Sequence, residues 1–349
     1  MQKRSNRSWK RTALIVLCVF LALVLLLLVG ATIWIEYMLG RIKNPEQQAT
    51  LSMEEIASIL NETDATNPDF TGPEVNPEDV TMPQGPVEII QTGEEVINIL
   101  LVGQDTRDGH RAHSDAMILC TINKRTKTLT MTSFMRDMYL RIPGYGKQRI
   151  NVAYLVGGFP MLDNTLKENF GVVVDRNIEV DFSAFQKCVD LVGGVDINLT
   201  TAEAEYLNRR GNWDVEENQG WQLKEGVNCL TGSQALAYSR IRAIGDDFGR
   251  TSRQRTVLNA LLEKAKHMDL GTLYSLMDAV VPMLTTDMQD SEIIGYVMEL
   301  APLLSELKVV NQRIPADGTY SFARVDGMEV ILPNFEKNWQ LLQDTIGGE

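Results

Sequence analysis

The chain opens with a long apolar segment. Residues 12–35 (TALIVLCVFLALVLLLLVGATIWI) carry no charged side chain. A helix rising about 1.5 Å per residue would extend roughly 36 Å over this run, enough to cross a hydrocarbon core of about 30 Å. A cleaved signal peptide is the alternative, but its apolar region usually spans only about 7–15 residues. The pattern therefore predicts one uncleaved transmembrane helix.

After residue 90, short apolar runs alternate with amphipathic segments. The run VINILLVG (96–103) is continuously apolar and ends in glycine, as a buried strand would. Further strands are predicted at 115–123, 128–134, 138–142, 176–182, 194–199, 307–314, 319–325 and 328–332. Helices are predicted near 51–61 and at 150–158, 160–171, 182–194, 231–239, 251–267, 270–281, 290–304 and 334–345. Strands that alternate with helices predict an α/β protein, with a single three-layer α/β/α domain around a central mixed sheet.

Charge is distributed unevenly, and this assigns the segments to the two sides of a membrane. The 349-residue chain has a net charge of −13, but residues 1–43 carry +6 and residues 44–106 carry −13. Because basic residues favour the cytoplasmic side, the N-terminus is expected inside and the remainder outside. The expected division is a cytoplasmic tail (1–11), a transmembrane anchor (12–35), an acidic extracytoplasmic stalk (36–90) and the α/β domain (91–349). No basic domain is present, which argues against a nucleic-acid partner.

Several common site motifs are missing from the sequence. It has three histidines and contains no HExxH motif, no P-loop pattern and no GxSxG elbow. Cys120, Cys188 and Cys229 lack metal-binding spacing, so free thiols are favoured, with one disulfide left open. These absences disfavour a zinc site and a serine nucleophile.

Two acids flank a predicted strand junction in the first part of the domain. Asp105 and Arg107 come directly after the strand that ends at Gly103, and Asp115 begins the next strand. Hairpin-like pairing of these strands would bring both carboxylates to one edge of the sheet, where α/β proteins bind ligands. Paired carboxylates suit Mg²⁺, which keeps water and phosphate as its other ligands. Acids on a loop that faces water are the alternative.

An arginine-rich stretch, YSRIRAIGDDFGRTSRQR (238–255), stands out in this acidic chain. Arg240 and Arg242 are two residues apart, so an extended backbone would project both to one side and Ile241 to the other. An anion that binds several guanidinium groups would explain this cluster better than a solvated helix face.

The predicted start of the next helix strengthens the case for an anion. Arg250 and Arg253 lie where cations oppose the helix dipole, and a bound anion would remove that conflict. One guanidinium group can donate two hydrogen bonds to the oxygens of a phosphate, so a diphosphate is the expected ligand of several arginines. Gln254 is either a ligand or the partner of Thr251 in a capping box. Arg136, at the end of a predicted strand, is a further candidate.

Ordered motifs run through about residues 96–266: LLVGQDTR, HSDAMI, SFMRDMYLRIPG, INVAYLVGG, VDFSAF, LVGGVDI, LTGSQALAYSRIR and DDFGRTSRQR. These motifs resemble the LytR–CpsA–Psr family of bacterial cell-wall glycopolymer ligases. The resemblance implies a membrane-anchored, Mg²⁺-dependent phosphotransferase with an extracytoplasmic catalytic domain. Its implied donor is a polyprenyl-pyrophosphate-linked glycopolymer (teichoic acid, capsule or another polymer), and its acceptor is peptidoglycan. Membrane lipid is a further implied partner, and polyprenyl phosphate is released.

The resemblance also implies residue roles. Asp105 and Asp115 match the Mg²⁺ carboxylates, and Asp247 matches an acid near the reacting centre that could accept the proton of the incoming hydroxyl. Arg240 and Arg242 would assist the reaction beside it. The expected pyrophosphate ligands are Arg107, Arg136, Arg240, Arg242, Arg250, Arg253 and Gln254.

Two other functions remain open from the sequence. A hydrolase that cleaves the same pyrophosphate with water would need the same ligands. A non-enzymatic envelope regulator or transcription attenuator is the second alternative, although only about eleven residues would remain in the cytoplasm to meet DNA. The chain departs from the family pattern at Met135, where proline is usual, and at His113, where arginine is usual.

Overall fold

The fold is described from a computed structural model of the chain. The described residues are 52–60, 70–83, 87–104, 113–209, 220–268 and 278–347, with isolated positions at 37, 40, 41, 43, 45, 85 and 276. The predicted anchor at 12–35, much of the predicted stalk and most of the predicted helix at 270–281 lie outside them. Within the described part, no helix is both long enough and apolar enough to cross a membrane.

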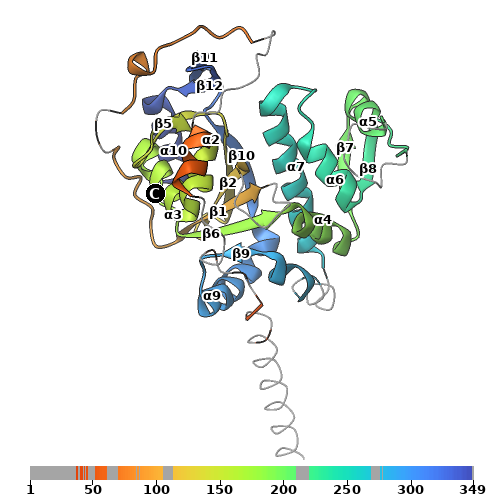
Figure 1. The fold of residues 1–349 in the computed structure, drawn as a ribbon. Coiled ribbons are helices and arrows are strands. Elements are labelled where there is room, and N and C mark those ends of the chain that lie inside the picture. Colours follow the sequence, from red (N-terminus) through yellow and green to blue (C-terminus); the bar gives the residue numbers. More distant parts are fainter. Residues whose placement is uncertain are drawn as a thin grey trace, which may run out of the picture.

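A six-stranded mixed sheet forms the centre of the domain (Figure 1). Its strand order is β10-β3-β2-β1-β6-β9. Antiparallel pairs join β1 to β2, β2 to β3 and β6 to β9, whereas β6 runs parallel to β1 and β10 runs parallel to β3. The strands are β1 (Val96–Gln104), β2 (Ser114–Asn123), β3 (Thr128–Phe134), β6 (Arg176–Asp181), β9 (Thr285–Thr286) and β10 (Lys308–Ile314). The predicted mixed sheet is confirmed.

Different helices cover the two faces of this sheet. Leu100 and Val102 of β1 share a buried cluster with α3 (Asn151–Phe170) and α10 (Phe335–Ile346). Leu101, which points the other way, packs with Leu258 and Leu262 of α7 (Asp246–Lys266). Figure 1 shows α3 and α10 on one side of the sheet and α7 on the other. The central part of the domain therefore has the three predicted layers.

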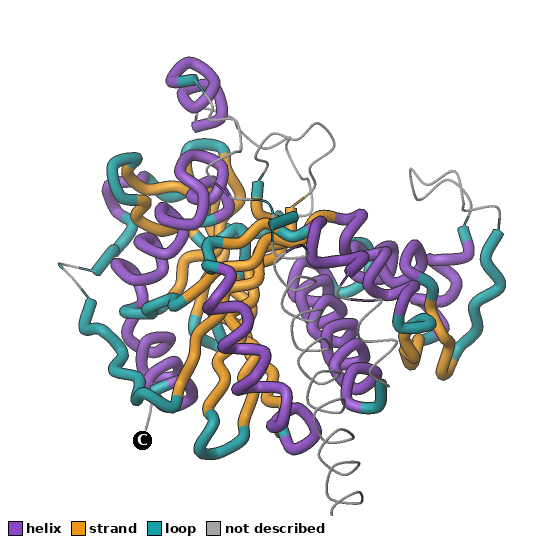
Figure 2. The backbone as a smooth tube through the Cα atoms, turned by 90° about the horizontal axis from the view of Figure 1, so that it is seen from below, coloured by secondary structure: helices purple, strands orange, loops and turns teal. Residues whose placement is uncertain are grey.

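A second unit packs on the far side of α7, as the tube in Figure 2 also shows. Val195 and Ile197 of its hairpin lie in one cluster with Val257 of α7. The unit consists of α4 (Phe182–Leu191), β7 (Val195–Leu199), α5 (Thr201–Asn208), β8 (Gly226–Leu230) and α6 (Gly232–Arg240). Because α7 touches both clusters, it joins this unit to the sheet.

Two chain segments before the domain attach to the edges of the fold. The amide of Lys43 donates to Leu284 O (3.2 Å), and the Lys43 carbonyl accepts from Thr286 N (3.3 Å), beside β9. Residues 70–83 pack beside β11 (Tyr320–Val325), where Val75 N donates to Arg324 O (2.8 Å), and Val80 is buried. The last part of the predicted stalk is thus packed against the domain.

The remaining elements are short. They are α2 (Met53–Leu60), η2 (Pro77–Asp79), β4 (Tyr139–Ile142), β5 (Gly146–Arg149), η3 (Val281–Met283), α9 (Asp290–Leu300), η4 (Ala301–Glu306), β11 (Tyr320–Val325) and β12 (Met328–Pro333). Elements β5, α5, β8 and β9 were not expected from the sequence.

Glycine geometry sets the helix boundaries. The two helices predicted at 150–158 and 160–171 are confirmed, because a non-helical conformation at Gly158 (φ 61°, ψ −152°) divides the span α3, and Gly171 ends it as expected (φ 69°). Helix α7 begins at Asp246 instead of Thr251, because Gly245 takes a left-handed conformation (φ 73°) that starts the helix one turn earlier. The three described cysteines, Cys120, Cys188 and Cys229, are free thiols.

Candidate active site

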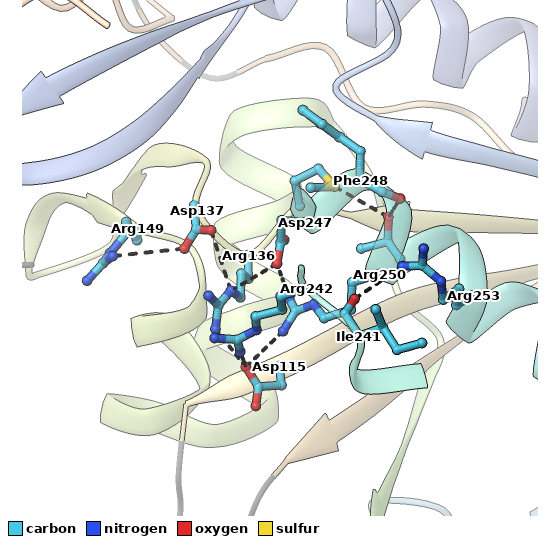
Figure 3. Close-up of polar contacts among 12 residues, drawn as sticks. Asp115, Arg136, Asp137, Arg149, Ile241, Arg242, Asp247, Phe248, Arg250 and Arg253 are labelled. Carbon is cyan, nitrogen blue, oxygen red and sulfur yellow. Dashed lines mark hydrogen bonds and ion pairs between the residues drawn. The ribbon is translucent and has the colours of Figure 1, made fainter. Parts of the chain in front are cut away.

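Guanidinium groups from three separate segments converge on the carboxylate of Asp115 (Figure 3). Arg136 Nη1 lies 2.9 Å from Asp115 Oδ1, and Arg242 Nη2 and Arg250 Nη1 each lie 3.4 Å from the same oxygen. Arg136 follows β3, Arg242 follows α6, and Arg250 lies in the first turns of α7. The convergence expected from the sequence is therefore present in the fold.

The start of α7 brings two of these arginines together. Gly249 N donates to Gly245 O (2.7 Å), and a Cβ at position 249 would lie only 2.8 Å from Ile244 O. Glycine at this position lets the loop after α6 fold closely over the first turn of α7. Arg242 of the loop thereby reaches the same carboxylate as Arg250 of the helix.

The earlier start of α7 overturns the capping box expected at Thr251. Thr251 Oγ1 donates to Phe248 O (3.0 Å) inside the helix and is not an N-cap. Gln254 lies in the body of the helix and lines a cavity, where its buried Oε1 accepts no hydrogen bond from a described residue. The capping role expected for Gln254 is therefore excluded, and its role as a ligand stays a prediction.

The prediction for Arg240 and Arg242 is confirmed in its geometry. Ile241 is fully buried with an extended ψ of 119°, and the arginines on either side of it line one cavity. The guanidinium of Arg240 lies 4.7 Å over the ring of Phe182, which orients it along the cavity.

This cavity has a volume of about 490 Å³ and lies between the sheet, α7 and the second unit. Asp115, Arg240, Arg242, Arg250 and Gln254 form its polar part. Its apolar walls come from Leu101, Ile118, Val180, Phe182, Phe185, Tyr206, Leu236 and Leu258. A cavity that is cationic in one part and apolar elsewhere suits a ligand with an anionic head and an apolar tail.

Charged groups are crowded at the polar end of the cavity. Burial raises the pKa of Asp115, but the guanidinium groups of Arg250, Arg136 and Arg242 outweigh burial and hold that pKa below its ordinary value. Arg242 is only partly shielded from solvent, but this shielding lowers its pKa, and the positive charges of Arg136 and Arg250 lower it further. Three guanidinium groups thus share one carboxylate oxygen, and a bound anion would relieve their mutual repulsion.

A second layer of acids holds these arginines from behind. Asp247 Oδ1 lies 2.8 Å from Arg250 Nη2 and 3.6 Å from Arg136 Nε. Asp137 Oδ2 lies 3.4 Å from Arg136 Nε, and burial raises the pKa of Asp137. Asp247 is not part of the cavity lining, so it contacts the site through Arg136 and Arg250. Its role as the proton acceptor stays a prediction.

Arg253 does not reach the cavity, contrary to the prediction. Its Nε lies 2.7 Å from Glu203 Oε1, and its Nη1 and Nη2 donate to Ile241 O (3.2 Å) and Ile244 O (2.7 Å). Because all three nitrogens of this guanidinium have partners, it fixes the loop that carries Arg242. Local sequence could not reveal this, because Glu203 is distant in the chain.

The predicted magnesium pair is only half described. Asp105 and Arg107 lie outside the described residues, and no group of three or more His, Cys, Asp or Glu side chains in the described part could hold a metal ion. Contacts of described residues with Asp115 all use Oδ1, so Oδ2 remains for another ligand. One carboxylate oxygen beside an anion site fits Mg²⁺, which takes few protein ligands when phosphate is present.

Several residues of the site were not singled out from the sequence. Phe182 and Phe185 lie in the helix predicted at 182–194, and both line the cavity together with Ser239. Asp181 also lines it and caps α4 by accepting from Ala184 N (2.7 Å). The position of these residues after the carboxyl end of β6 was the available signal.

The fold and site define a class: α/β proteins with a cavity beside a mixed sheet that combines arginines with apolar walls. The chain matches the LytR_cpsA_psr family over residues 53–343 and belongs to this family.

Similar proteins include transferases and a regulator. The polyisoprenyl-teichoic acid–peptidoglycan teichoic acid transferase TagU of Bacillus licheniformis is 36% identical over 187 residues, 53% of this chain and 57% of TagU. TagT of Bacillus subtilis, named for the same transfer, is 31% identical over 62% of this chain and 67% of TagT. Regulatory protein MsrR of Staphylococcus aureus is 36% identical over 47% of this chain and 48% of MsrR. The chain thus spans between about half and two thirds of these relatives.

Solved structures share the fold. The crystal structure of B. subtilis TagT has a TM-score of 0.59 at 26% identity, covering 76% of this chain and 97% of TagT. A TagT structure with bound octaprenyl pyrophosphate lipid has a TM-score of 0.57 at 26% identity and the same coverage.

Proposed function

We propose that this protein transfers a glycopolymer from a polyprenyl-pyrophosphate carrier to peptidoglycan. The observation that carries the proposal is the cavity of about 490 Å³, with arginines in its polar part and apolar walls elsewhere. A diphosphate would bind the arginines and an isoprenoid chain would fill the apolar part. The teichoic acid transferase names of TagU and TagT, and the octaprenyl pyrophosphate bound to TagT, support this proposal.

Transfer needs one bond to form and one to break. The acceptor hydroxyl oxygen attacks the phosphorus that carries the polymer, the phosphoanhydride bond breaks, and polyprenyl phosphate leaves. Arg240, Arg242 and Arg250 hold the diphosphate and stabilise the charge that develops on the leaving phosphate. The hydroxyl proton passes to a carboxylate. Asp247 is our candidate because its buried Oδ2 accepts no hydrogen bond from a described residue.

Asp115, together with Asp105, would hold a magnesium ion. When bound, Mg²⁺ supplies further neutralisation of phosphate charge. Asp115 keeps Arg136, Arg242 and Arg250 within 3.4 Å of one oxygen. These guanidinium groups are therefore held in place before the lipid-linked substrate binds.

The expected location is the outer face of a cell membrane, with a single span at 12–35 and the N-terminus inside. Support comes from the +6 charge of residues 1–43 before an acidic segment. Labelling from outside intact cells, at a cysteine introduced in place of exposed Val227, tests this topology. Protection of that cysteine from an impermeant reagent would contradict it.

Reconstitution tests the activity. The full chain in lipid nanodiscs, given polyprenyl-pyrophosphate-linked oligosaccharide, glycan strands and Mg²⁺, should yield phosphodiester-linked product and polyprenyl phosphate. Free sugar phosphate as the sole product would instead identify a hydrolase. Absence of any product from several donor polymers would sink both enzymatic functions.

The proposed lipid-binding role of the apolar cavity walls can be tested with polyprenyl pyrophosphates of different chain length. Leu258→Gln places a polar group on the apolar wall, whereas Val227→Gln changes a side chain that is 73% exposed on β8. We expect Leu258→Gln to weaken binding of a long polyprenyl pyrophosphate by about tenfold and to leave a short-chain analogue unaffected. An equal loss of affinity for both ligands would contradict contact between the lipid chain and the wall formed by Leu258.

A further inference from the structure

A group of aromatic rings lies beside the start of α7. The ring centroids of Phe248, Tyr320 and Phe322 are 5.1 to 6.0 Å apart, and Phe322 is 41% exposed. The guanidinium of Arg313, on β10, lies 4.2 Å over the Phe248 ring. We call these three rings with Arg313 the aromatic shelf. Phe248 directly follows Asp247, so the shelf adjoins the arginine cluster (Figure 3).

Positive charge at the shelf is not neutralised by buried acids. Arg255 of α7 is 9% exposed, donates to Ser133 Oγ (2.6 Å) and contacts no carboxylate of a described residue, and its Nε has no partner. Burial and the nearby charge of Arg313 lower the pKa of Arg255 to about 10. The acid that pairs with Arg313 is Asp317, whose side chain is 90% exposed. Two guanidinium groups and one solvated carboxylate leave an excess of positive charge.

The shelf and the lipid cavity use different sides of α7. Arg250, Gln254 and Leu258 line the cavity at intervals of four residues. Phe248 and Arg255 are seven residues apart and share another stripe, about 160° and 140° around the helix from Arg250 by 100° steps. That stripe packs toward β3 and β10, where Ser133 and Arg313 lie.

The geometry of phosphoryl transfer indicates which substrate would lie at the aromatic shelf. In phosphoryl transfer, the attacking and leaving oxygens lie roughly in line on opposite sides of the phosphorus. The leaving group is the lipid phosphate, whose chain occupies the cavity side of α7. The attacking hydroxyl therefore approaches from the other side of the arginine cluster, where the shelf lies.

We propose that the aromatic shelf binds the acceptor, a glycan strand that carries carboxylate groups, and that buried Arg255 adds positive charge behind it. Sugar rings present C–H faces that stack on aromatic rings, and guanidinium groups bind carboxylates. This inference rests on the proposed transferase function and adds the binding site of its second substrate.

The test uses the full chain in nanodiscs with a soluble muramyl glycan as acceptor. Phe322→Ala and Arg313→Gln should each raise the KM for this acceptor by about tenfold, while the Kd of the polyprenyl pyrophosphate donor stays unchanged. Asp317→Asn frees Arg313 from its exposed partner and should lower the acceptor KM by about twofold. Val227→Ala is the matched control, an exposed apolar side chain on the distant hairpin β7–β8.

The outcomes separate this inference from the proposed function. Unchanged acceptor KM in Phe322→Ala and Arg313→Gln, with transfer intact, would overturn the shelf and leave the transferase standing. A weaker donor Kd with an unchanged acceptor KM would also overturn it, because the shelf would then bind the donor polymer. Opposite shifts for Arg313→Gln and Asp317→Asn support it, since lost packing alone would not produce a gain.

Discussion

Arg250 Nη2 lies 2.8 Å from Asp247 Oδ1, one helical turn apart in α7. The side chain of Arg250 is only 3% exposed, and its other terminal nitrogen reaches Asp115. Arg242 contacts the same Asp115 oxygen at the same 3.4 Å but is 54% exposed. The site therefore combines a buried, fixed guanidinium with a solvated one, and the two are expected to respond differently to mutation.

Substitution of Arg242 should separate function from stability. Arg242→Ala removes an exposed ion pair, so we expect the free energy of unfolding to change by less than about 0.5 kcal/mol. Transfer should fall at least about a hundredfold, because a group that stabilises phosphate charge is lost. Arg250→Ala, the buried counterpart, should lose transfer and also about 3 kcal/mol of stability. Equal loss of stability in both variants, measured by denaturant unfolding, would contradict this distinction.

Neighbouring residues Arg253 and Gln254 should give the reverse contrast. Arg253→Gln leaves the buried carboxylate of Glu203 without its partner and should cost about 3 kcal/mol of stability. Gln254→Ala removes a side chain whose Oε1 has no described partner, so stability should hold while donor affinity falls about tenfold. Unfolding curves and donor titrations check the pair. Donor affinity lost in Arg253→Gln at temperatures where it remains folded would restore Arg253 as a ligand.

Asp163 should make stability depend on pH. Burial raises its pKa to about 7, against the hydrogen bond from Asn177 and with the help of the charge of Asp287. A raised carboxyl pKa means that the folded state keeps its proton between about pH 4 and 7, where the unfolded state has lost it. Stability from this group is therefore greatest below about pH 4 and declines up to about pH 7.

Asp163→Asn tests this origin of the pH dependence. The amide oxygen can still accept from Asn177, so the variant should gain about 1–2 kcal/mol at pH 8, relative to wild type, and lose the slope between pH 4 and 7. The same slope in wild type and variant, measured by urea unfolding at several pH values, would assign it to other groups.

Removal of the metal should greatly slow transfer without unfolding the protein. A chelator should lower the rate at least about a hundredfold, and added Mg²⁺ should restore it. Asp115→Asn should respond little to added Mg²⁺, because its neutral side chain is a poorer ligand. Full activity after thorough chelation would rule out the proposed magnesium requirement.

Much of the fold could be predicted because local patterns decide it. The apolar runs of β1 and β2 and the alternating polar and apolar residues of β3 favour strands, and Gly171 ends α3 as its position suggested. The two-residue strand β9 and the helix α5 carry too little periodicity to be seen. The start of α7 was misplaced because Thr251 and Gln254 imitate a capping box, and the left-handed conformation of Gly245 overrides it.

The site was predictable only as a set of charges. The arginines around Asp115 could be identified because such a cluster is unusual in an acidic chain. The resemblance to a family then assigned a role to each of them. The cavity walls were not, because Phe185 and Leu258 come together only when α4 and α7 pack. Arg253 shows the limit of this reasoning, since its partner Glu203 lies 50 residues away in the sequence.

The backbone bonds of Lys43 to the residues around β9 have a consequence for how the proposed transferase would meet its substrates. Under the proposed topology, with a span at 12–35, the sheet and not a linker of variable length would set the height of the α/β domain above the bilayer. Carrier lipids would then arrive by lateral diffusion within the membrane. Only glycan strands in a narrow layer of the cell wall would lie within reach of the transferred polymer.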